Sequence, residues 1–202
     1  MIDHFKKIIF IAIPKTGTKT IEKAVGSFID RHCHEEAAKL KFKFGEETFS
    51  QYFKFCFVRN PWDKTLSEFK FMKKRLGEHK SGTLRIKNNP TWPELSALDK
   101  MDFKTFITGG SEGKWDFPPS NSHWIVDSSG QIIVDFVGKF ENLQKGFDTV
   151  CEKIGIPQKQ LPHKNKTKHK HYAEYYDNKT REIVAEKHSK DIEYFGYKFG
   201  ED

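Results

Sequence analysis

Residues 13–20, Ile-Pro-Lys-Thr-Gly-Thr-Lys-Thr, combine the residue types that bind anions. They follow an apolar run at 7–13 and precede apolar residues that recur at helical spacing over 21–29. A tight loop between a strand and a helix binds anions because the first amides of the helix point at the ligand and the helix dipole favours negative charge. Gly17 lets the backbone approach closely, and threonine hydroxyls can donate hydrogen bonds. The predicted anion site consists of Pro14, Lys15, Thr16, Gly17, Thr18, Lys19 and Thr20.

This loop departs from the Walker A pattern of nucleoside triphosphatases, GxxxxGK[ST]. Ala12 stands at the first glycine position, and Thr18 follows Gly17 where that pattern has lysine. Lys15 instead precedes Gly17, so we expect it at the mouth of the loop. A P-loop kinase or another NTPase with an altered motif is one alternative. An ordinary strand–helix turn with a solvated lysine is the other.

A second segment, Phe-Cys-Phe-Val-Arg-Asn-Pro-Trp at 55–62, has the same pattern of a strand, a cationic residue and the start of a helix. Arg59 ends a predicted strand at 52–58, at the edge where ligands collect in open α/β sheets. Ser67 lies about two turns into the helix that should begin after Asn60, and its side chain should point back toward the helix start. A guanidinium and a hydroxyl together suit a phosphate group, although a structural ion pair is the alternative for the arginine.

The rest of the chain supplies the elements that must position these segments. We expect a hairpin over 123–140 with its turn near Gly130, then a helix from about Glu141 that Gly155 ends. Residues 77–120 should form a surface excursion with a short helix at 101–107, and residues 172–195 should be mostly helical. The sequence predicts an α/β fold of the P-loop-like kind, in three layers, with a central mainly parallel sheet flanked by helices. A single domain is expected over 1–202.

Composition narrows the class of partner. Lys plus Arg number 35 against 28 Asp plus Glu, a net charge of +7. A basic protein often binds a nucleotide, nucleic acid, an acidic sugar or a membrane, although a solubilising surface is the alternative. No apolar run reaches the length of a membrane span, and the first residues do not resemble a signal peptide. The three cysteines, Cys33, Cys56 and Cys151, form no CxxC pair and should be buried thiols, which favours a reducing, cytoplasmic location.

Taken together, Pro-Lys-Thr-Gly-Thr at 14–18 and the segment at 57–69 resemble the sulfotransferases that use 3′-phosphoadenosine-5′-phosphosulfate (PAPS). The similarity is greatest to the branch with carbohydrate and heparan sulfotransferases and bacterial relatives, and residues 135–155 and 175–199 resemble it too. This resemblance implies that the first loop holds the 5′-phosphosulfate and that Arg59 and Ser67 hold the 3′-phosphate. It also implies that a basic loop at 163–171 closes over the 3′-phosphate through Asn165, Lys166 and Thr167.

The resemblance implies transfer of a sulfuryl group from PAPS to a hydroxyl or amine of an acceptor, which we expect to be a carbohydrate or a small molecule. The ammonium of Lys15 would then stabilise charge on the leaving phosphate. A sulfuryl group moves as an intact SO₃ unit, so we expect no metal, with only Asp127 and Asp135 left open as ligands. A non-catalytic basic module that binds nucleic acid or sulfated glycan is the alternative from another class, although few aromatic residues interleave the basic loop.

A hydroxyl acceptor must lose its proton during attack, and histidine is the commonest side chain for that task near neutral pH. The resemblance implies that the segment after the first helix supplies the base, so His32 is the first choice and His34 the second. The alternatives for this His-x-His pair are a surface pair or half of a metal site. His123 and Trp115 are expected in the acceptor pocket, with a structural histidine and plain packing as their alternatives.

Overall fold

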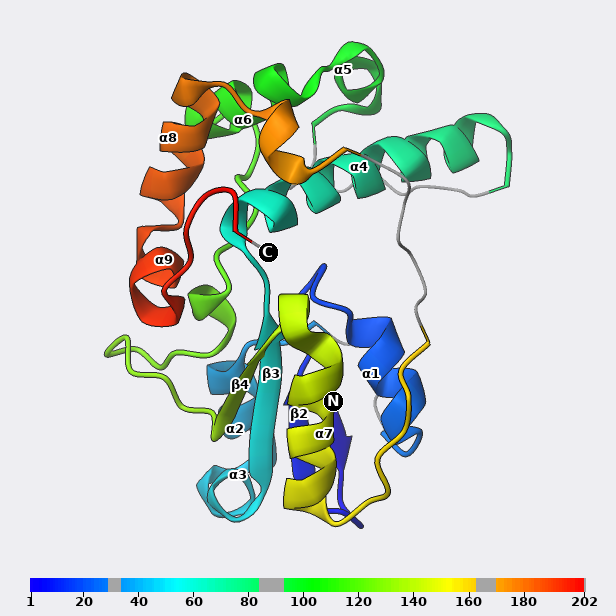
Figure 1. Ribbon diagram of the computed structural model, residues 1–202, viewed down its shortest axis with the longest axis vertical. Coiled ribbons are helices and arrows are strands. Elements are labelled where there is room, and N and C mark those ends of the chain that lie inside the picture. Colours follow the sequence, from blue (N-terminus) through cyan, green and yellow to red (C-terminus); the bar gives the residue numbers. More distant parts are fainter. Residues whose placement is uncertain (29–33, 84–92, 163–169, 202) are drawn as a thin grey trace. The chain divides into compact units, whose positions relative to one another are not determined.

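A computed structural model describes residues 1–28, 34–83, 93–162 and 170–201. The chain divides into two compact units. The first unit combines Met1–Asn60 with Asn121–His169 and Asp202, and the second combines Pro61–Ser120 with Lys170–Glu201. Figure 1 labels most of the helices and strands of both units. The expectation of a single domain over 1–202 stays a prediction.

The first unit is built on one sheet. Within the described residues the strand order is β1-β2-β3-β4, with β1 antiparallel to β2 and the other pairs parallel. Ile8 of β2 lies opposite Phe53 of β3, and Phe55 of β3 lies opposite Phe136 of β4. This sheet confirms the predicted mainly parallel α/β fold. The strands are β1 (Ile2–Asp3), β2 (Ile8–Ile11), β3 (Phe53–Val58) and β4 (Phe136–Lys139).

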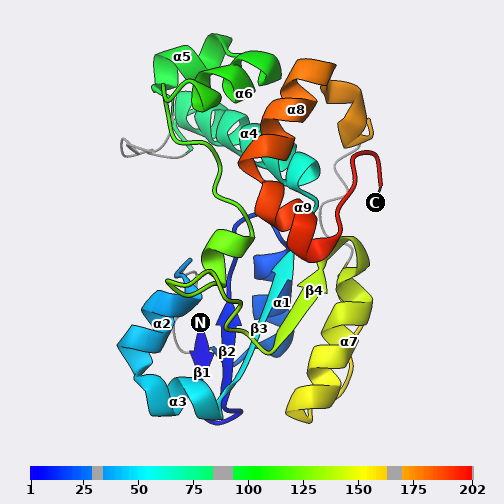
Figure 2. The same cartoon turned by 90° about the vertical axis from the view of Figure 1, so that its left-hand side faces the viewer.

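Helices cover both faces of this sheet. The apolar sides of α1 and α7 share one core cluster with Phe10, Phe55 and Phe57 of the strands, and Phe147 of α7 is fully buried there. Figure 2 shows α2 and α3 on the other side of the sheet from α7, which gives the three layers that the sequence predicted. The helical elements are α1 (Thr18–Val25), α2 (Ala37–Phe44), α3 (Glu46–Gln51), η1 (Ser122–Trp124), η2 (Phe140–Asn142) and α7 (Leu143–Ile154).

Two helices of the first unit end at glycine residues. Helix α1 ends at Gly26, where φ is 78° and the amide donates to the carbonyl of Glu22, although the apolar spacing ran on to residue 29. Helix α7 ends at Gly155 in the left-handed conformation, as predicted. A residue in that conformation closes the last turn and redirects the chain, because its amide satisfies a carbonyl that the helix leaves unpaired.

The predicted hairpin over 123–140 is wrong in its extent. Only Val126 pairs with Ile132, in an isolated antiparallel bridge around the turn near Gly130. The chain then leaves this turn, because the carboxylate of Asp135 accepts a hydrogen bond from the amide of Lys54 (2.7 Å) and the amide of Asp135 donates to the carbonyl of Lys54 (2.9 Å). Residues 136–139 therefore pair in parallel with β3.

The second unit is helical. Phe69 of α4 packs against Phe103 and Phe106 of α6, with ring centroids 5.5 and 5.3 Å apart. Trp62 of α4 donates its indole N–H to the carbonyl of Arg181 in α8 (3.0 Å). None of the helices described is long and apolar enough to cross a membrane. The elements are α4 (Pro61–Lys80), α5 (Leu95–Lys100), α6 (Phe103–Ser111), η3 (Tyr172–Tyr175), α8 (Asn178–Lys187) and α9 (Ser189–Phe195).

The helix predicted to begin after Asn60 is α4, and the helical C-terminal segment is formed by η3, α8 and α9. Helix α5 was not predicted. In the first unit, β1 and α3 were also missed, because β1 has only two residues and α3 only six.

Candidate functional site

The loop between β2 and α1 has the geometry of an anion site. Strand β2 ends at Ile11 and α1 begins at Thr18, so the loop lies at the carboxyl end of a parallel strand. Lys15 and Gly17 both have left-handed backbone conformations, with φ of 68° and 83°. The carbonyl of Gly17 accepts the first hydrogen bonds of α1, from Thr20 (2.9 Å) and Ile21 (3.2 Å). The earlier amides of this helix have no intrahelical carbonyl to bond, which is the arrangement that binds phosphate.

Two of the predicted threonine donors stabilise the loop itself. The hydroxyls of Thr16 and Thr18 both donate to the carbonyl of Ile13, at 2.9 and 2.8 Å, and both side chains are buried. Their protons are therefore directed into the loop in this structure. The backbone amides and the half-buried Thr20 are the better placed donors, while direct contacts from Thr16 and Thr18 to a ligand stay predictions.

The structure brings the two predicted anion-binding segments together. Arg59, just beyond the end of β3, donates from Nη1 to the carbonyl of Lys15 (2.9 Å). Its guanidinium also lies over the ring of Phe140, with Cζ 4.3 Å from the ring centroid. A left-handed conformation costs a non-glycine residue about 1–2 kcal/mol, so the hydrogen bond from Arg59 helps to hold Lys15 in it. Lys15 and Arg59 thus share one edge of the sheet.

Gly17 is required by packing as well as by conformation. A Cβ atom at this position would lie 3.0 Å from Cδ2 of Leu143 and 3.3 Å from the ring of Phe140. The start of α7 and the turn before it therefore form the floor of the loop. Phe140 and Leu143 were not predicted as site residues. The only sequence signal was their place in the segment 135–155 that resembles sulfotransferases.

Buried polar groups hold the second segment. Asn121, which is fully buried, accepts a hydrogen bond from the amide of Arg59 at Oδ1 (3.3 Å) and donates from Nδ2 to the carbonyl of Arg59 (2.9 Å). The next amide, that of Asn60, donates to the carboxylate of Glu141 (2.6 Å). Both partners lie far along the chain from residues 59–60, and no local motif could have revealed them.

A cluster of histidines lies beside the residue where the loop begins. Nδ1 of His34 is 2.5 Å from the carbonyl oxygen of Ala12. Because a carbonyl can only accept, Nδ1 carries a proton and Nε2 of neutral His34 carries a lone pair. Nε2 of His123 lies 3.4 Å from a carboxylate oxygen of Glu36, and Trp124 contacts both imidazoles at ring-centroid distances of 6.3 and 5.8 Å. His32 lies outside the described residues.

One residue of this cluster, Glu36, was not predicted as a site residue, whereas Trp124 was expected either to stack on a ring of the acceptor or simply to pack. The indole nitrogen of Trp124 is buried and has no hydrogen-bond partner among the described residues. A buried N–H without a partner is costly, which makes it a candidate donor to a ligand. The predicted base His34 and the predicted acceptor residue His123 therefore lie together around one aromatic ring.

The remaining predicted site residues lie elsewhere. Ser67 is half-buried on α4 of the second unit, whereas Arg59 belongs to the first. Trp115 belongs to the second unit and donates its indole N–H to the carbonyl of Phe106 (3.1 Å). Asn165, Lys166 and Thr167 lie outside the described residues, so their role stays a prediction.

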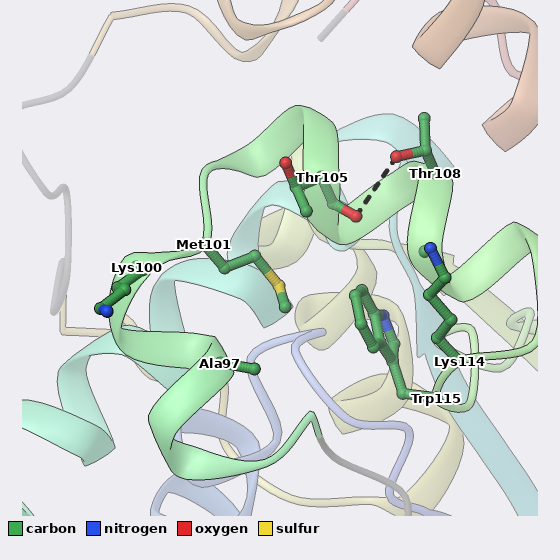
Figure 3. Close-up of a pocket in the computed structure, with 8 residues that line it drawn as sticks. Ala97, Lys100, Met101, Thr105, Thr108, Lys114 and Trp115 are labelled. Atoms are coloured by element: carbon green, nitrogen blue, oxygen red, sulfur yellow. Dashed lines mark hydrogen bonds between the residues drawn. The ribbon is translucent and has the colours of Figure 1, made fainter.

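Trp115 lines a cavity of about 310 Å³ in the second unit (Figure 3). Its ring lies on Gly109, where a Cβ atom would be only 2.2 Å from the indole. Figure 3 shows Met101 pointing toward the same space and Lys100 pointing away from it. The cavity is lined by Ala97, Lys100, Met101, Thr105, Thr108, Gly109, Lys114 and Trp115.

Neither metal ligation nor thiol chemistry is evident in the part of the chain that the structure describes. No group of three His, Cys, Asp or Glu side chains there is placed to hold a metal ion. Hydrogen bonds, first from Ser129, lower the pKa of Asp127, and Asp135 contacts the ammonium of Lys54 at 2.9 Å. Cys56 and Cys151 are buried free thiols, as predicted, and burial raises the pKa of both.

This protein is an α/β protein with a candidate anion site at one edge of its sheet. The site combines a loop whose lysine precedes its glycine with an arginine just beyond the adjacent strand. The sequence matches the sulfotransferase family over residues 1–198, and the chain belongs to that family. It is therefore a transferase of sulfuryl groups, and the resemblance inferred from the motifs is confirmed at the level of the family. The branch within the family stays a prediction.

The other comparisons add little about function. An uncharacterized protein of Archaeoglobus fulgidus is 28% identical over 119 residues, which cover 56% of this chain and 77% of that protein. No solved structure matches the chain.

Proposed function

We propose that this sulfotransferase transfers the sulfuryl group of PAPS to a hydroxyl or amine of a carbohydrate or small-molecule acceptor. The observation that carries the proposal is the hydrogen bond from Arg59 to the carbonyl of Lys15. It links a phosphate loop to a second cationic group at the same sheet edge. A nucleotide with phosphates at both the 5′ and 3′ positions matches two such adjacent groups.

The geometry of the loop supports binding of this donor. The first amides of α1 and the positive end of its dipole would hold the 5′-phosphate. A guanidinium has several N–H donors in a planar fork that matches the oxygens of a phosphate group, so Arg59 is the proposed partner of the 3′-phosphate. Ser67, Asn165, Lys166 and Thr167 remain predicted contacts of that phosphate.

The proposed reaction is an in-line displacement at sulfur, in which a lysine and a histidine assist. The acceptor oxygen attacks sulfur, the bond from sulfur to the bridging oxygen breaks, and its electron pair stays on the leaving phosphate. The ammonium of Lys15 stabilises that charge, and the proton of the acceptor passes to Nε2 of a histidine. His34 suits this role because its Nδ1–H is held by Ala12. His32 remains the other candidate for the base.

The acceptor side is the cluster of His34, His123 and Trp124, whose indole N–H can donate to a ligand oxygen. Trp115 stays a predicted contact for a ring of the acceptor. A cytoplasmic location, a soluble donor and no requirement for a metal complete the proposal.

The test uses 3′,5′-adenosine bisphosphate (PAP), the product of the donor, and labelled PAPS. We expect PAP to raise the melting temperature of the wild type. Lys15→Ala should keep PAP binding but lose about 10²–10³-fold in turnover, the typical loss for one preorganised donor to developing charge. Lys23→Ala, which removes an exposed lysine from the last turn of the same helix, is the matched control and should keep full turnover.

Other results would favour the alternatives. An absence of any thermal shift with PAP would refute the proposal. Binding of Mg²⁺-ATP that outcompetes PAP would indicate a P-loop kinase or another NTPase. Binding to nucleic acid or sulfated glycan that falls steeply with salt and ignores PAP would indicate a non-catalytic basic module.

A further inference from the structure

Asn121 joins two parts of the chain that are 62 residues apart. Its side-chain amide forms reciprocal hydrogen bonds with the amide and the carbonyl of Arg59, in the manner of a neighbouring strand. The side chain is fully buried, so water cannot replace these bonds. The backbone of Arg59 is therefore fixed at the point where its side chain must turn toward Lys15 and Phe140.

The same residue begins the turn that carries the acceptor-side groups. The carbonyl of Asn121 accepts from the amide of Trp124 (3.1 Å), and the carbonyl of Ser122 accepts from the amide of Ile125 (3.0 Å). This turn, η1, presents His123 to Glu36 and Trp124 to His34. The side chain of Asn121 thus fixes the backbone of Arg59, while the carbonyl of Asn121 begins the turn that carries His123 and Trp124.

We propose that Asn121 is a positioning residue that sets the distance between the donor site and the histidine cluster. This inference rests on the proposed sulfuryl transfer. In-line transfer requires the acceptor oxygen, sulfur and leaving oxygen to be aligned, and a misplacement of about 1 Å can cost about a hundredfold in rate. Asn121 acts through Arg59 and through η1, and it does not itself touch the reacting atoms.

Only a side chain with both a donor and an acceptor can make this pair of bonds. Aspartate can accept from the amide of Arg59 but, as a carboxylate, cannot donate to the carbonyl. Serine is too short to reach both groups at once, and alanine makes neither bond. The series Asn121→Asp, Asn121→Ser and Asn121→Ala should therefore lose turnover progressively.

The control is Thr180→Ala. Thr180 is also buried and hydrogen-bonded, but it caps α8 in the second unit through Asp177. Both variants lose buried hydrogen bonds, so the free energy of unfolding should fall in each. Only the Asn121 variants should lose kcat, by about a hundredfold for alanine, while the dissociation constant for PAP changes by less than about tenfold.

A double-mutant cycle separates positioning from a general loss of stability. In the Lys15→Ala background, Asn121→Ala should cost less than about tenfold in further turnover, because the ammonium that Asn121 aligns with the histidine cluster, by way of Arg59, is already absent. Thr180→Ala should have the same small effect in both backgrounds. A full additional hundredfold loss would overturn the inference, as would an Asn121 series no slower than Thr180→Ala. A wild type that ignores PAP would overturn the proposed function and this inference together.

Discussion

Gly17→Ala should damage the donor site in a way that Gly26→Ala does not. Both glycines have left-handed backbone conformations, with φ of 83° and 78°, and they flank the same helix, α1. Placing alanine in that conformation costs about 1–2 kcal/mol at either position. A Cβ at residue 26 would meet nothing closer than a carbonyl oxygen at 3.9 Å, whereas at residue 17 it would meet Leu143 at 3.0 Å and Phe140 at 3.3 Å.

The two variants should therefore differ by the cost of this crowding. Overpacking of a tight contact typically costs about 1–3 kcal/mol, so Gly17→Ala should lower the free energy of unfolding by about 2–5 kcal/mol against about 1–2 kcal/mol for Gly26→Ala. Phe140 also contacts the guanidinium of Arg59, so a shift of its ring reaches both halves of the donor site. We expect Gly17→Ala to weaken PAP binding at least about tenfold, which is about 1.4 kcal/mol, and Gly26→Ala to leave it unchanged.

Urea unfolding followed by circular dichroism measures the first quantity, and calorimetric titration with PAP at a temperature where both variants are folded measures the second. Equal losses of stability would show that the loop relaxes away from Phe140 and Leu143 without cost. Equal PAP affinities would show that this loop is not where the phosphate binds.

Further predictions concern the other groups of the site and one buried histidine. Phe140→Leu should weaken PAP binding about 2- to 30-fold, because a contact between Arg59 and an aromatic ring contributes about 0.5–2 kcal/mol; calorimetry with unchanged affinity would contradict it. His34→Gln should lower kcat about 10²–10⁴-fold with little change in PAP affinity, and normal turnover would point to His32 as the base. Trp115→Ala should raise the acceptor KM while PAP affinity stays constant; an unaltered KM with every active acceptor would exclude Trp115 from binding. Burial lowers the pKa of His188, so the unfolded chain takes up a proton first as pH falls below about 6.5. Stability should therefore decrease from pH 7 to pH 5, and this slope should be shallower in His188→Gln when urea unfolding is repeated across that range.

The parts of the site that local patterns encode were predictable. An apolar run, a short loop with a glycine and a helical repeat are contiguous in sequence, so β2, the loop and α1 could be placed without knowledge of the rest of the chain. Arg59 followed from the same reasoning, because its strand and the Asn-Pro start of α4 adjoin it. These features depend on interactions over a few residues.

The parts that depend on tertiary contacts were not predictable. The ring of Phe140 contacts the guanidinium of Arg59, and the side chain of Asn121 forms hydrogen bonds with the backbone of Arg59. No sequence motif around Phe140 or Asn121 indicates either contact. The predicted hairpin failed for the same reason, since the bonds between Asp135 and Lys54 direct residues 136–139 to β3. His34 was only a second choice, and its contact with Ala12 became visible only in the fold.

The hydrogen bond between Arg59 and Lys15 also limits which changes in chain length this protein can tolerate. Residues Ile11 and Cys56 are register partners in β2 and β3, and the two site segments leave the sheet a few residues beyond them. One residue inserted in β3 would move its later side chains to the opposite face, and Arg59 with them. An insertion near Gly130 would only enlarge an exposed turn. Relatives and engineered variants should therefore differ in length around residues 127–131, while the spacing from each strand to Lys15 and to Arg59 stays constant.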